Sequence, residues 1–261
     1  MRNPAQPPRV AAVSYLNTVP LVWGVLHGPQ RSAMDLDFCV PSECADRVRD
    51  GRAAIGIVPV IEIARQELEI IPGNGIACRG PVRSILLISR KPFGQIKSVA
   101  CDLGSRTSVV LTEIILREKY GVTPEFRAMP PDLAPMLGAA DAALIIGDPA
   151  LRINPAALPY AYVDLGAEWT SWTGLPMVFA AWAGRPENIP PDAAAEFAGS
   201  YAFGEANLGE IIRAESAARG FAPALVREYL TRHIAFSLGE RDYDGMKAYL
   251  RMAGALTPAR V

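Results

Sequence analysis

Hydrophobic runs alternate with amphipathic segments along most of the chain, which is the pattern of strands alternating with helices. The first apolar run, residues 9–15, predicts a strand, and residues 19–28 predict a helix with Pro20 in its first turn. The alternation continues with strands at 35–40, 53–60, 68–73 and 83–90 and helices at 41–51 and 61–66. Because helices separate most of these strands, we predict parallel βαβ units whose sheet is covered on both faces.

A second series of the same kind predicts another sheet. Its strands are expected at 96–102, 124–129 and 141–149, and its helices at 105–121 and 131–140. The run 176–184 predicts a strand that returns to the first half, and the pattern after it is helical. We therefore predict an α/β fold of two lobes with a ligand cleft between them. The expected division is 1–90 with 181–261 for the first lobe and 91–180 for the inserted second lobe, with crossings near 88–95 and 178–184.

Composition narrows the class of protein. The chain has 261 residues, half of them hydrophobic, and a formal net charge of -1, which suits a globular protein with one large or two modest cores. The near balance of charges argues against nucleic acid or an anionic membrane as the main partner. No apolar run reaches the roughly 18 residues of a membrane span. The N-terminal stretch is polar and Pro-rich, without an apolar signal core, so we expect a cytoplasmic protein.

Few residues of the types that bind metals or act as bases are present. The four cysteines are too irregularly spaced for a disulfide framework or a zinc site, and we expect reduced structural thiols at Cys39, Cys44, Cys78 and Cys101. With only two histidines, a Ser-His-Asp triad or a His-based metal site is not expected. Walker-type, GxGxxG, HExxH and GxSxG motifs are absent from the sequence, and we expect no metal and no cofactor.

The junction between the first strand and the first helix carries more polar groups than a turn requires. One capping residue is enough for a strand-to-helix turn, yet the sequence SYLNTVP offers Ser14, Tyr15, Asn17 and Thr18. In open α/β sheets ligands bind beyond the carboxyl ends of strands, where helix N-termini gather. These four side chains are therefore candidates for binding a ligand.

A matching junction follows the strand that ends at Asp102. There Gly104 permits a tight turn, and a helix opens with Ser105, Arg106, Thr107 and Ser108. Free backbone N–H groups, hydroxyls and a guanidinium suit a carboxylate or a phosphate. Taken alone, the segment is equally well explained as a helix cap with a solvated arginine. Two such junctions facing each other across a cleft favour a small anionic ligand.

Three further polar positions have two interpretations each. Gly147 and Asp148 end a strand of the second series, where Asp148 either lines the cleft or caps a helix. Asp164 has the same ambiguity. Ser84 begins a strand near a predicted crossing, where a single serine is more often structural.

Several segments together resemble a known family. The segments VSYLNTVPL, DLGSRTSVVLTEIIL and DLGAEWTSWTGLPMVFAAWAG, in this order, are similar to those of the chorismate dehydratases of the futalosine route to menaquinone. The likeness extends along nearly the whole chain. It implies the two-lobed fold of type II periplasmic binding proteins, used here by a cytoplasmic lyase. That lyase removes water from chorismate, a small anionic substrate, to give 3-[(1-carboxyvinyl)oxy]benzoate.

The resemblance also implies site residues. The family is thought to use the enolpyruvyl carboxylate of its own substrate as the base, together with an Asn and a Ser of the protein. By motif these are Asn17 of SYLNT and Ser84 of RSILL. The product is aromatic, so the elimination is strongly downhill and needs little acid-base help. One departure stands out, because many relatives have serines where this chain has Pro59 and Val60.

Two alternatives stay open at this point. The first is a binding protein without chemistry, in which Arg106 holds a carboxylate and Asp148 an amine. The second is the sister cyclase acting on dehypoxanthine futalosine, which carries a histidine base where this chain reads Ile146-Gly147-Asp148. Since His27 and His233 are the only histidines, the second alternative is the weaker one.

Overall fold

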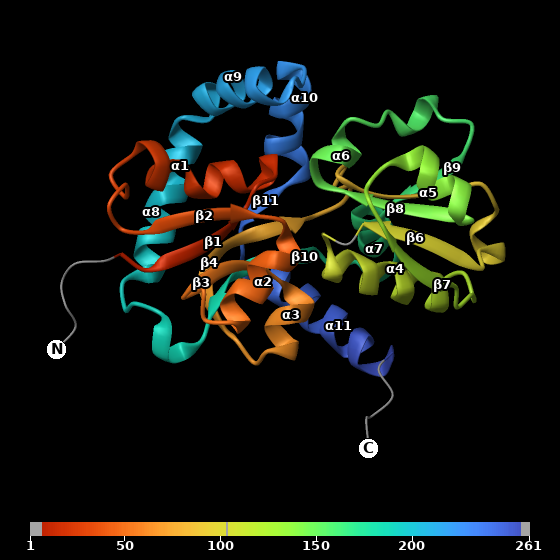
Figure 1. The fold of residues 1–261 in the computed structure, drawn as a ribbon, viewed down its shortest axis with the longest axis horizontal. Coiled ribbons are helices and arrows are strands. Elements are labelled where there is room, and N and C mark those ends of the chain that lie inside the picture. The colour runs from red at the N-terminus through yellow and green to blue at the C-terminus, as the bar shows by residue number, and fades with distance from the viewer. Residues whose placement is uncertain (1–6, 103, 257–261) are drawn as a thin grey trace.

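Two β-sheets, each flanked by helices, form the protein (Figure 1). The structure is a computed structural model that describes residues 7–102 and 104–256. The first six residues of the polar N-terminal stretch lie outside the described part.

The first sheet contains six strands in the order β11-β4-β10-β3-β1-β2. Their bounds are β1 Arg9–Val13, β2 Asp35–Cys39, β3 Ile55–Pro59, β4 Glu69–Cys78, β10 Met177–Gly184 and β11 Ala235–Ser237. β1 pairs with β2 and β3 in parallel, as predicted. β10 and β4 pair antiparallel, as do β10 and β3 and also β11 and β4, so the predicted parallel βαβ pattern does not extend to that side of the sheet.

The second sheet contains five strands in the order β7-β6-β8-β5-β9. Their bounds are β5 Ile85–Ser89, β6 Ser98–Asp102, β7 Glu125–Met129, β8 Ala142–Ile146 and β9 Ala161–Asp164. The units built from β6, β7 and β8 are parallel, whereas β5 pairs antiparallel with both β8 and β9. β9 was not predicted; it is only four residues long and lies at the sheet edge, where none of its residues is fully buried.

Helices cover both faces of the sheets (Figure 1). The main ones are α1 Val19–His27, α2 Pro41–Arg49, α3 Val60–Arg65, α4 Arg106–Glu118, α5 Leu133–Ala139, α6 Gly147–Leu151, α7 Leu165–Thr173, α8 Ala193–Ala206, α9 Leu208–Arg219, α10 Pro223–Glu228 and α11 Glu240–Leu256. A strand covered on both faces buries every side chain, which explains the continuous apolar runs of β3, β5, β8 and β10. Trp182 of β10, for example, stacks on Phe197 of α8 with ring centroids 4.1 Å apart.

The chain passes between the sheets at two places. β4 ends at Cys78 in the first sheet and β5 begins at Ile85 in the second. The return follows α7, before β10 begins at Met177 in the first sheet. The predicted division at residues 90 and 180 stays a prediction. Sheet membership favours earlier boundaries, because β5 pairs within the second sheet and all of β10 within the first.

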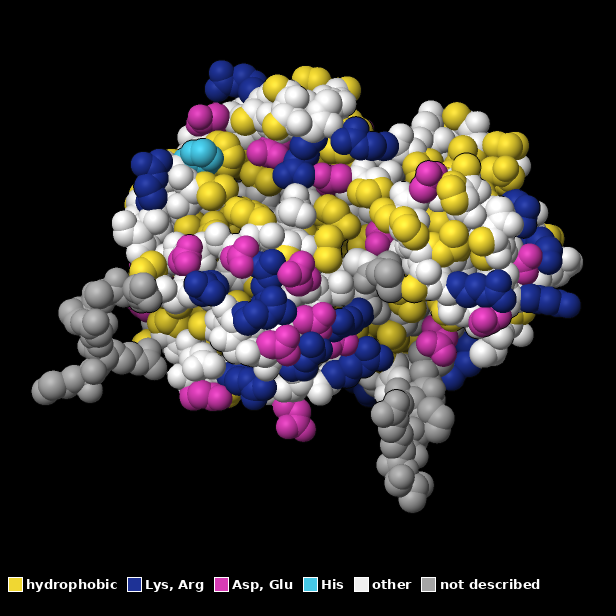
Figure 2. Space-filling view, viewed as in Figure 1, with side chains coloured by type: hydrophobic (Ala, Val, Ile, Leu, Met, Phe, Trp, Pro, Cys, Tyr) yellow, Lys and Arg dark blue, Asp and Glu magenta, His cyan; other side chains and the backbone are white. Residues whose placement is uncertain are grey.

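The segment after α10 differs from the predicted continuous helix. It forms a π-helical turn, Tyr229–His233, and then the short strand β11. Within the described residues, no helix is long and apolar enough to cross a membrane. On the face shown in Figure 2, Lys and Arg side chains are interspersed with Asp and Glu. Ion pairs in the protein include Arg47–Glu43 and Arg65–Glu62.

Candidate active site

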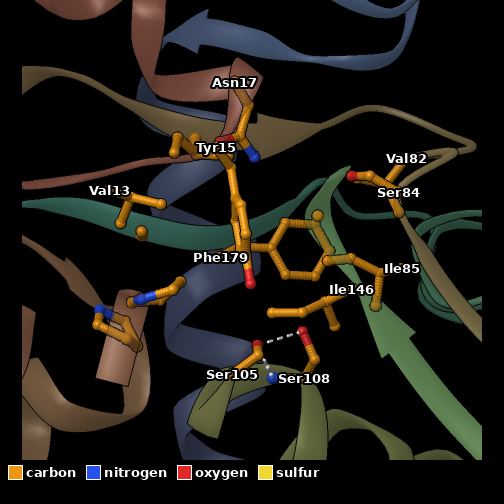
Figure 3. A pocket seen from close by; sticks show the side chains of 15 residues that line it. Val13, Tyr15, Asn17, Val82, Ser84, Ile85, Ser105, Ser108, Ile146 and Phe179 are labelled. Atoms are coloured by element: carbon orange, nitrogen blue, oxygen red, sulfur yellow. Dashed lines mark hydrogen bonds between the residues drawn. The ribbon is translucent and has the colours of Figure 1, made fainter. Parts of the chain in front are cut away.

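A cavity of about 50 Å³ lies between the two lobes (Figure 3). Its walls come from the strand ends of both sheets and from the segment that links them. The lining residues are Val13, Tyr15, Asn17, Pro41, Pro59, Ile76, Val82, Ser84, Ile85, Ser105, Ser108, Ile146, Gly147, Phe179 and Ala180. Six of the eleven residues predicted to form the site therefore line one cavity.

The first polar junction contributes Tyr15 and Asn17. Residues Leu16–Thr18 form a 3-10 helix between β1 and α1, which turns both side chains into the cavity (Figure 3). The buried Oδ1 of Asn17 has no hydrogen-bond partner among the described residues. Burial raises the pKa of Tyr15, and the nearby carboxylates Asp102 and Asp148 raise it further. Tyr15 is therefore a neutral hydroxyl, and Asn17 offers an unused polar group.

The other two residues of that junction do not line the cavity. Ser14 is exposed, and its backbone N–H donates to the carbonyl of Cys39 in the neighbouring strand. Thr18 is buried, and its hydroxyl has no partner among the residues that the structure describes.

The second polar junction places two serines in the cavity. Ser105 caps α4, since its Oγ accepts the N–H of Ser108 over 3.3 Å, and its hydroxyl donates to Ser108 Oγ over 2.7 Å. Both hydroxyls face the tip of Tyr15 at the lower end of the cavity (Figure 3). Together with the N-terminus of a 13-residue helix, they suit a carboxylate.

Arg106 and Thr107 point elsewhere and do not line this cavity. Arg106 donates to Asp46 of α2 over 2.9 and 3.0 Å and to Glu62 of α3 over 3.1 Å. Thr107 Oγ1 accepts the N–H of Ile61 over 3.4 Å. Both residues join the start of α4 to the first lobe.

Gly147 lines the cavity, but its neighbour Asp148 does not. Gly147 has a φ of +61°, and a Cβ there would lie 2.5 Å from the ring of Tyr15, so both conformation and space require glycine. Asp148 accepts the N–H of Leu16 over 3.0 Å and forms an ion pair with Arg219. Asp148 thus ties α6 of the second lobe to the first.

Ser84 is held firmly in the linking segment. Asp164 accepts the N–H groups of Val82 over 2.9 Å and of Arg83 over 2.6 Å. Arg83 has a φ of +65°, an uncommon backbone conformation for a residue with a side chain. The Ser84 carbonyl accepts the N–H of Gly147 over 2.8 Å. The three contacts fix the backbone around Ser84, and Asp164 acts here as a structural acceptor.

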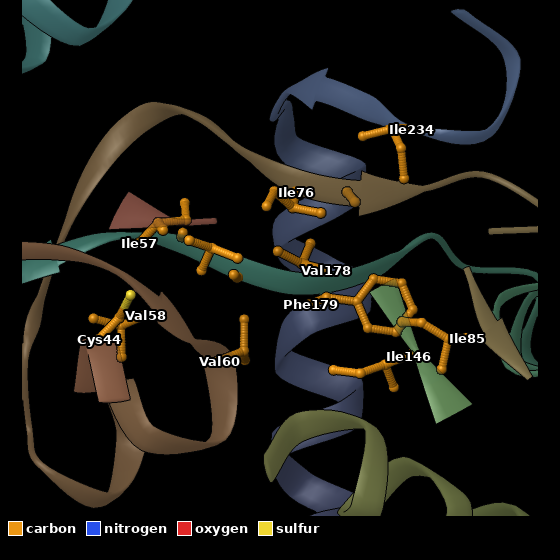
Figure 4. Packing of buried hydrophobic residues seen from close by; sticks show 14 of the residues in the cluster. Cys44, Ile57, Val58, Val60, Ile76, Ile85, Ile146, Val178, Phe179 and Ile234 are labelled. Carbon is orange, nitrogen blue, oxygen red and sulfur yellow. The ribbon is translucent and has the colours of Figure 1, made fainter. Parts of the chain in front are cut away.

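Sequence reasoning missed the apolar wall of the cavity. The pairing of β10 with β4 shifts register between Val178 and Ala180, and this bulge turns Phe179 into the cavity (Figure 4). Bulges of this kind occur often beside active sites. Ile85 and Ile146 face Phe179 from the second sheet (Figure 4). Pro59 also lines the cavity.

The lining residues that the structure describes include neither a charged side chain nor a histidine. Their polar groups are two serine hydroxyls at α4, the hydroxyls of Tyr15 and Ser84, and the amide of Asn17. Such a wall orients and desolvates a ligand, but it supplies no base that titrates near neutral pH. Among the described residues, none of the His, Cys, Asp or Glu side chains gather in a group that could hold a metal ion.

Residues 8–255 match a family described as "Menaquinone biosynthesis". The chain belongs to this menaquinone biosynthesis family. A curated relative, the chorismate dehydratase of Thermus thermophilus, is 30% identical over 233 residues, which span 82% of this chain and 85% of the relative. The family resemblance predicted from the sequence is confirmed.

Several solved structures have a fold similar to that of this protein. A crystal structure of an Archaeoglobus fulgidus protein superposes with a TM-score of 0.79 at 17% identity, covering 97% of this chain and 98% of the other. The periplasmic aliphatic sulphonate binding protein of Escherichia coli superposes with a TM-score of 0.66 at 14% identity, covering 98% and 95%. The predicted periplasmic-binding-protein-like α/β fold is therefore confirmed.

Proposed function

We propose that the protein is a chorismate dehydratase, a hydro-lyase that converts chorismate to 3-[(1-carboxyvinyl)oxy]benzoate and water. The observation that carries the proposal is the meeting of Asn17 and Ser84 in one cavity of a chain from the menaquinone biosynthesis family. The relative from Thermus thermophilus, named for the same activity, supports the choice of reaction.

The start of α4 is the proposed site for one substrate carboxylate. Ser105 and Ser108 supply hydroxyls there, and the helix N-terminus adds a positive partial charge. Because these donors are neutral, binding depends on hydrogen bonds in a desolvated site rather than on an ion pair. Arg106 has a different role in this proposal, since its guanidinium joins α4 to α2 and α3.

Asn17 and Ser84 are the proposed catalytic residues. The cavity wall supplies no side chain that acts as a base near neutral pH, which fits a substrate that removes its own proton through its enolpyruvyl carboxylate. In the elimination a C–H bond and the C–OH bond break, a ring double bond forms, and the proton and hydroxyl leave as water. The amide N–H groups of Asn17 would donate to the departing hydroxyl or align the carboxylate, and the Ser84 hydroxyl would orient the same groups.

Closure of the lobes would complete the site. The cavity of about 50 Å³ is smaller than ordinary ligand pockets, so substrate entry requires the lobes to separate. Contacts such as Arg106–Asp46 and Arg219–Asp148 join the lobes in the closed form. Exclusion of water then strengthens the few polar contacts on the substrate.

Incubation of the purified protein with chorismate tests the proposal. Formation of an aromatic product that has lost one molecule of water, detected by absorbance and mass spectrometry, is the expected result. Saturable binding of chorismate without turnover would instead support the alternative of a binding protein. A cytoplasmic location, the absence of a cofactor and chorismate as the small-molecule partner belong to the same proposal.

A further inference from the structure

Tyr229 is a buried residue whose hydroxyl lies directly behind the cavity. It begins the π-helical turn Tyr229–His233 and is 1% exposed. Its hydroxyl donates to Ser84 Oγ over 2.8 Å, although the two residues are 145 positions apart in the chain. Tyr229 itself is not among the residues that line the cavity.

The same hydroxyl is also close to Asn17. Burial raises the pKa of Tyr229, and the neighbouring Ser84 and Asn17 side chains work against that rise. Asn17 lines the cavity together with Ser84, the hydrogen-bond partner of Tyr229. Tyr229 is therefore hydrogen-bonded to one proposed catalytic side chain, Ser84, and lies near the other, Asn17.

The direction of the hydrogen bond between Tyr229 and Ser84 has a chemical consequence. When Ser84 Oγ accepts a hydrogen bond from Tyr229, the hydroxyl proton of Ser84 is left free to point into the cavity. A second contact holds the same turn against the linking segment, since Nδ1 of His233 lies 2.9 Å from the carbonyl oxygen of Pro81. The π-helical turn thus keeps Tyr229 in register with Ser84.

Packing alone does not call for a hydroxyl at this position. A phenylalanine would fill the same space, and a buried hydroxyl adds a desolvation cost unless it is hydrogen-bonded. Here its hydrogen-bond partner is the hydroxyl of Ser84, which is proposed to act on the substrate. By contrast, the hydroxyl of the buried Tyr249 donates to a backbone carbonyl, that of Thr107, over 3.1 Å.

We propose that Tyr229 is a positioning residue for the dehydration, which sets the hydroxyl of Ser84 in its reactive direction. This inference rests on the proposed chorismate dehydratase activity. Tyr229 touches no reacting atom and acts only through Ser84.

Tyr229→Phe removes the hydroxyl and keeps the ring. We expect kcat for chorismate to fall about tenfold, which is the loss of one well-aligned hydrogen bond, while KM changes by less than about twofold. Tyr120→Phe is the matched control, because the Tyr120 hydroxyl donates a hydrogen bond to Glu168 and Tyr120 does not line the cavity. That control is expected to keep both kcat and KM.

A double-mutant cycle with Ser84→Ala separates positioning from a general structural effect. If Tyr229 acts through Ser84, then Tyr229→Phe lowers kcat strongly in the wild type and much less in the Ser84→Ala background. Equal losses in both backgrounds, or a wild-type kcat in Tyr229→Phe, would overturn the inference. If Tyr229→Phe does not fold, 3-fluorotyrosine at position 229 keeps the ring and strengthens the donor, and an unchanged kcat would then count against the inference.

The outcome also distinguishes this inference from the proposed function. A wild-type protein that forms no product from chorismate contradicts the proposed function itself. An active wild-type protein with a fully active Tyr229→Phe variant contradicts only the role of Tyr229.

Discussion

Arg106 in α4 of the second lobe donates hydrogen bonds to both carboxylate oxygens of Asp46 in α2 of the first lobe. The same guanidinium reaches Glu62 of α3 over 3.1 Å. An arginine that begins a helix facing a cleft is thus used to join the lobes. Arg106 is not among the residues that line the cavity where a substrate anion would lie.

The first prediction follows for Arg106→Ala. The side chains of Arg106 and Asp46 are 30% and 25% exposed, and such partly exposed ion pairs contribute only about 1 kcal/mol. We expect KM for chorismate to rise by about fivefold, through a less stable closed form, with kcat nearly unchanged. Glu62 keeps its pair with Arg65 over 2.9 Å, so the fold is retained. A rise in KM of more than about a hundredfold would show that Arg106 holds the substrate directly.

The second prediction compares two neighbouring residues of α4. Ser108→Ala removes a hydroxyl from the cavity wall and should raise KM several-fold, about what the loss of one hydrogen bond to a charged group costs. Thr107→Val removes a hydroxyl that accepts only the Ile61 N–H over 3.4 Å, and it should leave KM unchanged. Steady-state kinetics of the two variants, side by side, check this. Equal effects would mean that the helix start contributes as a cap alone.

The third prediction concerns pH and Asp102. This carboxyl is 5% exposed; its Oδ1 accepts the Gly104 N–H over 2.8 Å, and its Oδ2 has no partner among the described residues. Burial raises the pKa of Asp102 above its ordinary value, with the Gly104 N–H acting in the opposite direction. Below about pH 4 the Asp102 carboxyl is protonated in both the folded and the unfolded state, so its titration does not change the free energy of unfolding. As pH rises, the unfolded chain releases its proton first, and the folded state loses stability until the folded pKa is passed.

Asp102→Asn removes this penalty and keeps an oxygen for Gly104. The melting temperature of the variant should therefore exceed that of the wild type by more at pH 7 than at pH 4. Thermal melts of both proteins at the two pH values measure it. A difference that is the same at both pH values would mean that Asp102 titrates normally.

The predicted site residues that line the cavity share a simple signal. Asn17, Ser105 and Ser108 are polar side chains at the carboxyl ends of buried strands, and strand ends of both lobes meet at the cleft. The same rule also selected Arg106 and Thr107, which do not line the cavity. Successive residues of a helix turn by about 100°, so 105 and 108 share a face while 106 and 107 point away from it.

Long-range pairing accounts for what the sequence could not predict. The hydrophobic run of β5 looks the same whether it pairs in the first sheet or the second. The three residues of β11 are too few for a strand signal inside a helical pattern. Tyr229 lies on an ordinary apolar stripe, and nothing local shows that its hydroxyl meets Ser84. Each of these features depends on a contact between distant parts of the chain.

The fourth prediction concerns Asn17. An aspartate is as good at a helix start as an asparagine, so Asn17→Asp should fold with a melting temperature close to that of the wild type. In the closed cavity it would set a carboxylate against a dianionic substrate, where charge repulsion is poorly screened, and remove the amide N–H groups. Losing one preorganised donor typically costs on the order of 10²–10³-fold in rate. Substrate binding through Ser105 and Ser108 is expected to persist in weakened form.

The turnover of chorismate by wild-type and Asn17→Asp protein, measured with a thermal melt on the same samples, tests the central claim most directly. The account predicts an aromatic, dehydrated product from the wild type and a rate lower by about 10²–10³-fold from a variant that melts normally. Full activity in the variant would contradict the catalytic role of Asn17, and no product from the wild type would contradict the proposed reaction.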